Sequence, residues 1–150
     1  MTNQTNHTNH INHINKTAII TGASRGIGAA IAKKLASCGY NLSLCCRNSS
    51  DRLKALADEL HCAYGIEVLC YTGNVGDFFF AKDMVTNTIS HFGHIDVLIN
   101  NAGISHIGLL SDMTPEEWNN IVAINLTGVF NFTKPVSYTH LRAHETRGNL

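Results

Sequence analysis

The stretch T-G-A-S-R-G-I-G, Thr21–Gly28, decides the fold class of this chain. It follows an apolar, β-branched run and precedes residues with helical spacing, so it is expected to connect a buried strand to a helix. There Gly22 permits a tight turn, Gly26 lets the backbone approach a pyrophosphate, and Gly28 lets the helix pack closely on the strand. The helix N-terminus adds free N–H groups, so the stretch predicts a dinucleotide-binding loop. An ordinary glycine-rich loop is the alternative, whereas a P-loop is excluded because no Gly-Lys-Ser/Thr follows.

Strand and helix patterns alternate after this loop. Short apolar runs predict strands over residues 17–21, 41–46, 66–72 and 95–99. Helical spacing and end signals predict helices from the glycine loop to Gly39, from Asn48 to Tyr64, from Asp77 to Phe92, and from Thr114 to about Phe132. Strands separated by such helices indicate βαβ units with a parallel sheet, which is the Rossmann-type, doubly wound α/β class.

The start of the last predicted helix carries several N-terminal signals. Thr114 is a preferred N-cap, Pro115 suits the first helical position, and Glu117 stands three residues after the cap. The pattern predicts a capping box between the side chains and backbone N–H groups of Thr114 and Glu117.

The composition excludes several protein classes. The chain has 150 residues, of which 44% are hydrophobic, and its 11 basic and 11 acidic residues give a formal net charge of zero. This length suits one domain, and the lack of a basic surplus argues against a nucleic-acid partner. No apolar run reaches membrane-spanning length and no hydrophobic signal segment is visible, so a cytoplasmic protein is expected.

The five cysteines stand in apolar segments without zinc-type spacing. Their odd number and their setting predict reduced core residues, and no metal site is expected. They are Cys38, Cys45, Cys46, Cys62 and Cys70.

Residues 1–15 differ from the rest of the chain. Asn recurs at every third position from Asn3 to Asn15, with histidines at His7, His10 and His13, and no apolar periodicity is present. The segment is predicted to be a disordered tail. A metal-binding role for the three histidines is the alternative, which their loose spacing disfavours.

Two further motifs accompany the glycine loop, whose spacing is Gly-x-x-x-Gly-x-Gly. N-N-A-G follows the predicted fourth strand at Asn100–Gly103, and Asn125 stands in the apolar stretch I-V-A-I-N-L-T-G-V-F, Ile121–Phe130. In their order and separations these motifs resemble the short-chain dehydrogenase/reductase family over residues 16–135. The resemblance implies the strand order 3-2-1-4. It makes residues 16–135 an incomplete NAD(P)-binding domain, truncated after the fourth strand and its following helix.

The resemblance also implies roles for individual residues. The glycine loop would bind the cofactor's pyrophosphate, and Asn101, Ala102 and Gly103 would line its adenosine ribose and hold the central sheet. Asn125 matches the family's active-site Asn, which kinks its helix and holds a water of the proton relay. An exposed helix position is the alternative, which the apolar surroundings disfavour. The predicted cofactor-binding residues are Gly22, Ser24, Arg25, Gly26, Ile27, Gly28, Arg47, Asn74, Val75, Asn101, Ala102 and Gly103.

The end of the predicted second strand indicates which cofactor is bound. A cofactor without a 2′-phosphate is usually read by an acidic residue there, but this strand ends Cys45-Cys46-Arg47-Asn48. Arg47 and Arg25 can both reach a 2′-phosphate, and Ser49 can add a hydrogen bond. NADP(H) is therefore predicted, with a merely solvated Arg47 as the alternative. Asn74 stands where the family often carries an Asp that touches adenine, and Asn can still hydrogen-bond the ring.

The residues that carry the family's reaction are missing from the sequence. The family uses a Ser and a Tyr-x-x-x-Lys pair, in which the Tyr donates a proton and the Lys lowers its pKa. Tyr138, the one Tyr after Asn125, stands too close to it and has Arg142 at the Lys position. Residues 136–150 show no clear helix or strand period and resemble a translated sequencing adapter. They are interpreted as a non-native tail on a truncated gene, with a divergent natural tail as the alternative.

Within the family, the chain most resembles bacterial 3-oxoacyl-[acyl-carrier-protein] reductases of fatty acid biosynthesis. This implies an NADPH-dependent oxidoreductase, a homotetramer in its full form, which reduces a small-molecule or carrier-bound 3-oxoacyl ketone to the 3-hydroxy form. Reduction of a 5-aminopentanone group on elongation factor P is the alternative. The 150-residue polypeptide itself is expected to be a non-catalytic nucleotide-binding fragment, without nucleic-acid, membrane or metal partners.

Overall fold

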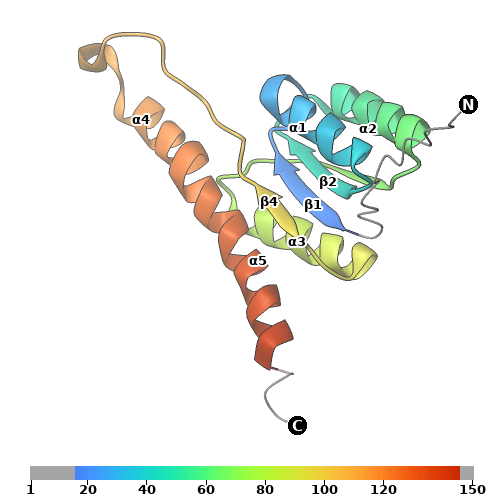
Figure 1. The fold of residues 1–150 in the computed structure, drawn as a ribbon. Helices are drawn as coiled ribbons and strands as arrows, with labels where there is room; N and C mark the ends of the chain where they lie inside the picture. The colour runs from blue at the N-terminus through green and yellow to red at the C-terminus, as the bar shows by residue number, and fades with distance from the viewer. Residues whose placement is uncertain (1–15, 146–150) are drawn as a thin grey trace, which may run out of the picture.

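The computed structural model describes residues 16–145, with side chains up to residue 138, as a parallel sheet between two layers of helices (Figure 1). The strands are β1 (Thr17–Thr21), β2 (Asn41–Cys46), β3 (Val68–Thr72) and β4 (Val97–Ile99). They pair in the order β3-β2-β1-β4, always in parallel. The predicted fold class and strand order are confirmed. The Asn/His-rich segment 1–15, for which a disordered tail was predicted, lies outside the described residues.

The helices are α1 (Gly26–Ser37), α2 (Ser50–Tyr64), α3 (Phe78–Phe92), α4 (Pro115–Val122) and α5 (Gly128–Glu145). A short 3₁₀ turn, η1 (Leu110–Asp112), precedes α4, and a π-helical turn, η2 (Ala123–Thr127), joins α4 to α5. The segments α4, η2 and α5 run on as one rod along the sheet (Figure 1), which we call the α4–α5 rod. No helix in the described part of the chain is long and apolar enough to cross a membrane.

The last helix is longer than predicted. It was predicted to end at about Phe132, but it continues through Pro135 to Glu145, into residues where the sequence shows no clear helix or strand period. Val136 is buried and packs in the same core cluster as Phe132, one helical turn earlier. The apolar contact beneath α3 extends the helix where the sequence pattern showed no period.

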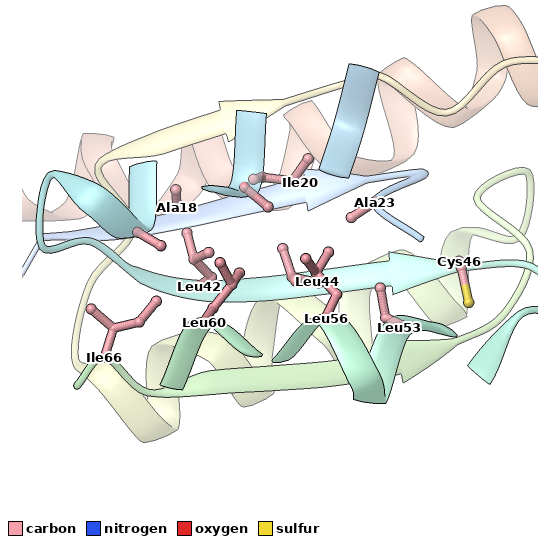
Figure 2. Packing of buried hydrophobic residues seen from close by; sticks show 12 residues of the cluster. Ala18, Ile20, Ala23, Leu42, Leu44, Cys46, Leu53, Leu56, Leu60 and Ile66 are labelled. Atoms are coloured by element: carbon pink, nitrogen blue, oxygen red, sulfur yellow. The ribbon is translucent and has the colours of Figure 1, made fainter. Parts of the chain in front are cut away.

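One core cluster lies between the sheet and the helices α1 and α2 (Figure 2). Leu53, Leu56 and Leu60 of α2 are buried against Leu42 and Leu44 of β2, as the helical spacing of these leucines predicts.

The buried stripe of α1 consists of small residues. Ile27, Ile31 and Leu35 give the sequence its helical spacing, but Ile27 is 73% exposed and the buried residues are Gly28, Ala32 and Ala36. Small side chains let α1 lie close to β1, so this face turns inward and Ile27 turns toward solvent. Ile31 and Leu35 remain at the edge of the core.

The second core cluster lies on the opposite face of the sheet, under α3 and α5. Ile19 and Cys45 of the sheet pack here with Met84 and Val85 of α3. Phe132 of α5 is fully buried and meets the ring of Phe80 edge to face, with centroids 6.3 Å apart.

Both ends of α3 and the start of α4 form where the sequence predicts them. The side chain of Asp77 accepts the N–H of Phe79 at 2.8 Å, and Gly93 ends α3 with a left-handed backbone. At α4, the N–H of Thr114 donates to the Glu117 carboxylate at 2.8 Å, and the N–H of Glu117 donates to Thr114 Oγ1 at 3.2 Å. The predicted capping box is therefore confirmed.

The cysteines do not all behave as predicted. Cys45 and Cys46 are buried, and all five thiols are free. Cys62, however, is exposed on α2, so its prediction as a core residue is wrong. Cys62 lies on the opposite face of α2 from the leucines that pack on the sheet. The apolar residues near it in the sequence did not indicate this orientation.

Candidate cofactor site

A cavity of about 640 Å³ opens at the carboxyl ends of the strands, where ligands bind in parallel α/β sheets. It is lined by the loops that follow all four strands and by Ile124 of η2. Of the predicted cofactor-binding residues, the cavity is lined by Gly22, Ser24, Arg25, Gly26, Ile27, Arg47, Asn74, Val75, Asn101, Ala102 and Gly103. Gly28 and Asn125 do not line the cavity. Gly28 lies behind the cavity wall, and Asn125 lies beside it.

The glycine loop owes its shape to two close approaches. Gly22 has φ +67°, and a Cβ atom there would lie 2.9 Å from the Cα atom of Ala102. A Cβ atom on Gly28 would lie 2.5 Å from the carbonyl oxygen of Gly22. Any larger side chain at these two positions would push the phosphate loop away from the helix or from the loop after β4.

Gly26 stands at the opening of this loop. Its φ is +57°, and nothing lies within 4 Å of the place where a Cβ atom would be. Helix α1 begins at this residue, its N-cap Arg25 makes no side-chain cap, and the first-turn N–H groups have no intrahelical partner. Gly26 and Ile27 of this turn line the cavity. Free N–H groups beside an open glycine form a cradle for an anion such as a pyrophosphate.

Asn101 ties the loop after β4 to the glycine loop. Its side-chain nitrogen donates to the carbonyl oxygens of Thr21, at 2.9 Å, and Gly22, at 3.1 Å. Thr21 Oγ1 in turn accepts the backbone N–H groups of Asn101 and Ala102, both at 3.0 Å. The N-N-A-G motif thus joins the loop after β4 to the glycine loop, and Thr21 is a supporting residue that the sequence reasoning missed.

The adenosine end of the predicted site carries two free cations. Arg25 and Arg47 come from the loops after β1 and β2, and both are exposed at the cavity. Neither guanidinium group forms a hydrogen bond or an ion pair with another residue in the described range. Among the described residues, no carboxylate lines the cavity, so the two arginines give it a positive potential suited to a phosphate.

Asn74 lies in the loop after β3. Its side-chain oxygen accepts the N–H of Gly76 at 3.0 Å, and its backbone oxygen accepts the N–H of Asp77 at 2.9 Å. The side-chain amide nitrogen has no hydrogen-bond acceptor among the described residues. The loop is therefore folded by Asn74 itself, which also lines the cavity.

Several lining residues were not predicted. Cys45 lies under the glycine loop, where burial raises the pKa of its thiol to about 12 and keeps it neutral. The others stand next to predicted positions. The rule that loops at strand carboxyl ends line such sites would have found all of them except Ile124, which lies in η2. The unpredicted lining residues are Cys45, Cys46, Asn48, Gly73, Ile104 and Ile124, and Ser49, considered for a 2′-phosphate contact, also lines the cavity.

Asn125 lies in the π-helical turn η2, where the resemblance implied a kink. Its side-chain oxygen accepts the N–H of Ile104 at 2.9 Å, and its nitrogen donates to the carbonyl oxygen of Ile104 at 2.8 Å. Asn125 is exposed, so the expectation that its apolar neighbours would bury it is wrong. Leu126 and Phe130 are exposed with it, because this side of the rod has no partner in the described chain.

Ser137 and Tyr138 lie away from the cofactor cavity. Tyr138 is 62% exposed on α5, and the Ser137 hydroxyl donates to the carbonyl oxygen of Thr133 at 2.8 Å. Neither residue lines the cavity, which agrees with giving them no catalytic role.

Comparisons with known proteins give the same family. A profile described as short chain dehydrogenase matches residues 16–149. A 3-oxoacyl-[acyl-carrier-protein] reductase of Staphylococcus epidermidis is 42% identical over 127 residues, which are 85% of this chain and 52% of the relative. An acetoacetyl-CoA reductase of Rhizobium meliloti is 38% identical over 81% of this chain and 48% of the relative.

A solved structure shares the fold closely. A short-chain dehydrogenase from Burkholderia cenocepacia in complex with NADP superposes with a TM-score of 0.81 and 30% identity, over 85% of this chain and 51% of that one. The chain spans about half the length of the curated relatives that it matches. From the profile match, the glycine loop and the strand order together, the chain belongs to the short-chain dehydrogenase family.

Proposed function

We propose that the protein to which this chain belongs is an NADPH-dependent oxidoreductase that reduces a 3-oxoacyl group carried by acyl-carrier protein to the 3-hydroxy form. One observation carries the cofactor part: Arg25 and Arg47 stand unpaired at a cavity that has no carboxylate in its lining. The relative from Staphylococcus epidermidis supports the substrate part, since it is named for this reaction.

The cavity fits the cofactor at each point that the chain supplies. Gly26 and the free N–H groups of α1 would hold the pyrophosphate, and Arg25 and Arg47 would hold the 2′-phosphate. The side-chain amide N–H of Asn74 would donate a hydrogen bond to the adenine ring. NADPH, when bound, supplies the hydride that reduces the ketone.

Asn125 would act as a positioning residue at the nicotinamide end. Its two hydrogen bonds fix the peptide of Ile104, which lines the cavity. The sequence contains no Tyr-x-x-x-Lys. We therefore propose that the 150-residue polypeptide binds NADPH but does not reduce a ketone, because it lacks a proton donor.

We also propose that residues 136–150 are a non-native tail. Arg142 at the expected Lys position supports this, since Arg cannot approach neutrality as a tuned Lys can. Resequencing the genomic locus tests it: we expect the reading frame to continue after Pro135 into a Ser-bearing strand and a Tyr-x-x-x-Lys pair. A locus that encodes residues 136–150 unchanged would overturn this interpretation.

A thioester of coenzyme A is the second candidate substrate. The similarity to the acetoacetyl-CoA reductase favours it. In the full-length protein, rates of NADPH oxidation with acetoacetyl-carrier protein and acetoacetyl-CoA distinguish the two. A higher kcat/KM for the carrier-bound substrate is expected, and the reverse order would favour the second candidate.

The variant Arg47→Asp tests the cofactor assignment. A charge-assisted contact to a 2′-phosphate is worth roughly 1.5–3 kcal/mol, so the NADPH dissociation constant should rise about 10- to 100-fold while that for NADH changes little. Isothermal titration calorimetry of the 150-residue chain at low micromolar concentration measures both constants.

Arg52→Asp is the matched control for Arg47→Asp. Arg52 is exposed on α2 and does not line the cavity, so the same charge change there should leave both constants nearly unchanged. Equal losses in the two variants would show that long-range charge, and not a direct contact, sets the preference. Unchanged NADPH affinity in Arg47→Asp would reject the assignment.

A further inference from the structure

Helix α5 carries a buried polar side chain, Asn131, that has no role in the proposed function. Asn131 is 2% exposed, although Asn is seldom fully buried without a reason. Its side-chain nitrogen donates to the backbone carbonyl oxygen of Val75 at 3.0 Å, across a sequence separation of 56 residues. Val75 belongs to the loop after β3, which lines the cofactor cavity together with Asn74.

The same loop meets the α4–α5 rod at two more points. A Cβ atom on Gly128, one helical turn before Asn131, would lie 2.9 Å from Val75 Cγ2. A Cβ atom on Gly76 would lie 3.2 Å from the carbonyl oxygen of Ala123. The two glycines thus allow the loop to pack against the rod, and the hydrogen bond from Asn131 fixes where Val75 lies along the rod.

The position of this loop matters for a ligand at the adenosine end. The main-chain oxygen and side-chain oxygen of Asn74 are both used inside the loop, by Asp77 and Gly76. Its amide nitrogen can therefore reach a ligand only where the whole loop places it. A shift of Val75 would move this donor with it, since the two residues are adjacent in one short turn.

The rod then supports both ends of the cavity. Asn125 holds the peptide of Ile104 after β4, and Asn131, six residues later, holds Val75 after β3. We propose that Asn131 is a positioning residue for the adenosine end of the cofactor site, which acts by fixing the loop Gly73–Asp77 and touches no ligand itself. This inference rests on the proposed function as an NADPH-binding protein.

Asn131→Leu is the test variant, because Leu fills a similar volume but leaves the Val75 carbonyl oxygen without its donor. The loop would then populate its binding conformation for only part of the time. The apparent affinity falls by that fraction, so we expect a loss of about 3- to 10-fold. The probe is adenosine 2′,5′-bisphosphate, the adenosine half of NADPH, measured by calorimetry against nicotinamide mononucleotide, the other half, whose affinity should not change.

Thr88→Val is the matched control. Thr88 is also fully buried; its hydroxyl donates to the carbonyl oxygen of Met84 and is hydrogen-bonded to the hydroxyl of Ser43, both at 2.7 Å, but none of the three lines the cavity. Its loss should lower the melting temperature without changing the bisphosphate affinity. Asn131→Ser, which keeps a small polar side chain too short to reach Val75, replaces Asn131→Leu if that variant does not fold.

Hydrogen exchange gives a readout that needs no ligand. The backbone N–H groups of residues 73–77 should exchange at least about threefold faster in the Asn131 variant than in Thr88→Val, at equal global stability. Unchanged exchange there, or a bisphosphate affinity equal to that of the control, would overturn the inference. If the unchanged chain binds neither NADPH nor the bisphosphate, the proposed function fails, and the exchange measurement still decides whether Asn131 positions the loop.

Discussion

Gly26 and Gly39 share a left-handed backbone but differ in what lies beside them. Their φ angles are +57° and +83°, and neither has an atom within 4 Å of a Cβ position, yet only Gly26 lines the cofactor cavity. A β-branched side chain is strained at either position. The pair therefore separates the cost of strain from the loss of a ligand.

Gly26→Val should abolish detectable NADPH binding, because its side chain would occupy the open space that the pyrophosphate needs. Gly39→Val should destabilise the fold by a similar amount, about 1–2 kcal/mol, and leave the affinity unchanged. Thermal unfolding and calorimetry on both variants measure the two effects. Normal NADPH affinity in folded Gly26→Val would show that the pyrophosphate lies elsewhere.

The thiols offer a second test at the residue scale. Burial raises the pKa of Cys45 to about 12, so at pH 8 only roughly one molecule in ten thousand carries its thiolate, whereas Cys62 is exposed. Iodoacetamide should alkylate Cys62 within minutes and leave Cys45 unmodified until the chain unfolds in urea. Peptide mass spectrometry follows both sites, and early alkylation of Cys45 in the native chain would contradict its burial.

At the scale of the element, α4 depends on its first turn. Helix α4 has no buried residue, so tertiary packing contributes little to its start and the capping box carries it. Thr114→Ala should cost about 1 kcal/mol of stability by removing the acceptor for the N–H of Glu117. Urea unfolding measures this loss, and Ser111→Ala, outside the helix, is the control that should change little.

The same capping box predicts a dependence on pH. The N–H of Thr114 holds the pKa of Glu117 below its ordinary value of 4.5, because in the folded state this hydrogen bond stabilises the ionised carboxylate. The stabilisation is present above that ordinary value and is lost as the pH falls through the lowered one. NMR titration of the Glu117 carboxyl group should show the lowered midpoint in the native chain and the ordinary midpoint in the urea-unfolded chain, where the hydrogen bond from the Thr114 N–H is absent. An ordinary midpoint in the native chain would contradict the capping box.

At the scale of the whole molecule, the 150-residue chain exposes surfaces that invite association. Strand β4 pairs with β1 on one side only, and Trp118, Leu126 and Phe130 of the rod are exposed. An unpaired apolar strand edge and an apolar helix face both favour contact with other copies of the chain. We expect the chain to self-associate in solution, in proportion to its concentration.

Size-exclusion chromatography with light scattering tests this expectation. Leu126→Glu should shift the distribution toward the monomer, because it places a charge on the exposed face of the rod. Tyr64→Glu, which removes an exposed aromatic residue from α2, should have no such effect. If the chain without substitutions stays monomeric at high concentration, neither surface mediates self-association.

The sequence by itself determined the local architecture. Helix ends such as Asp77, Gly93 and the Thr114 box follow from hydrogen bonds between residues two to four positions apart. Strands Thr17–Thr21 and Asn41–Cys46 were predicted with the bounds that the structure gives, because continuous apolar runs between turn signals leave little choice.

Only the tertiary structure decided which distant residues meet. The pairings of Asn125 with Ile104 and of Asn131 with Val75 join residues 21 and 56 positions apart, so no local spacing contains them. The exposure of Ile27 and the helical continuation beyond Pro135 depend on which neighbours fill the space beside each side chain. Local hydrogen bonds fix an element wherever it stands, but burial and long-range pairing exist only once the packed sheet and helices have brought both partners to one place.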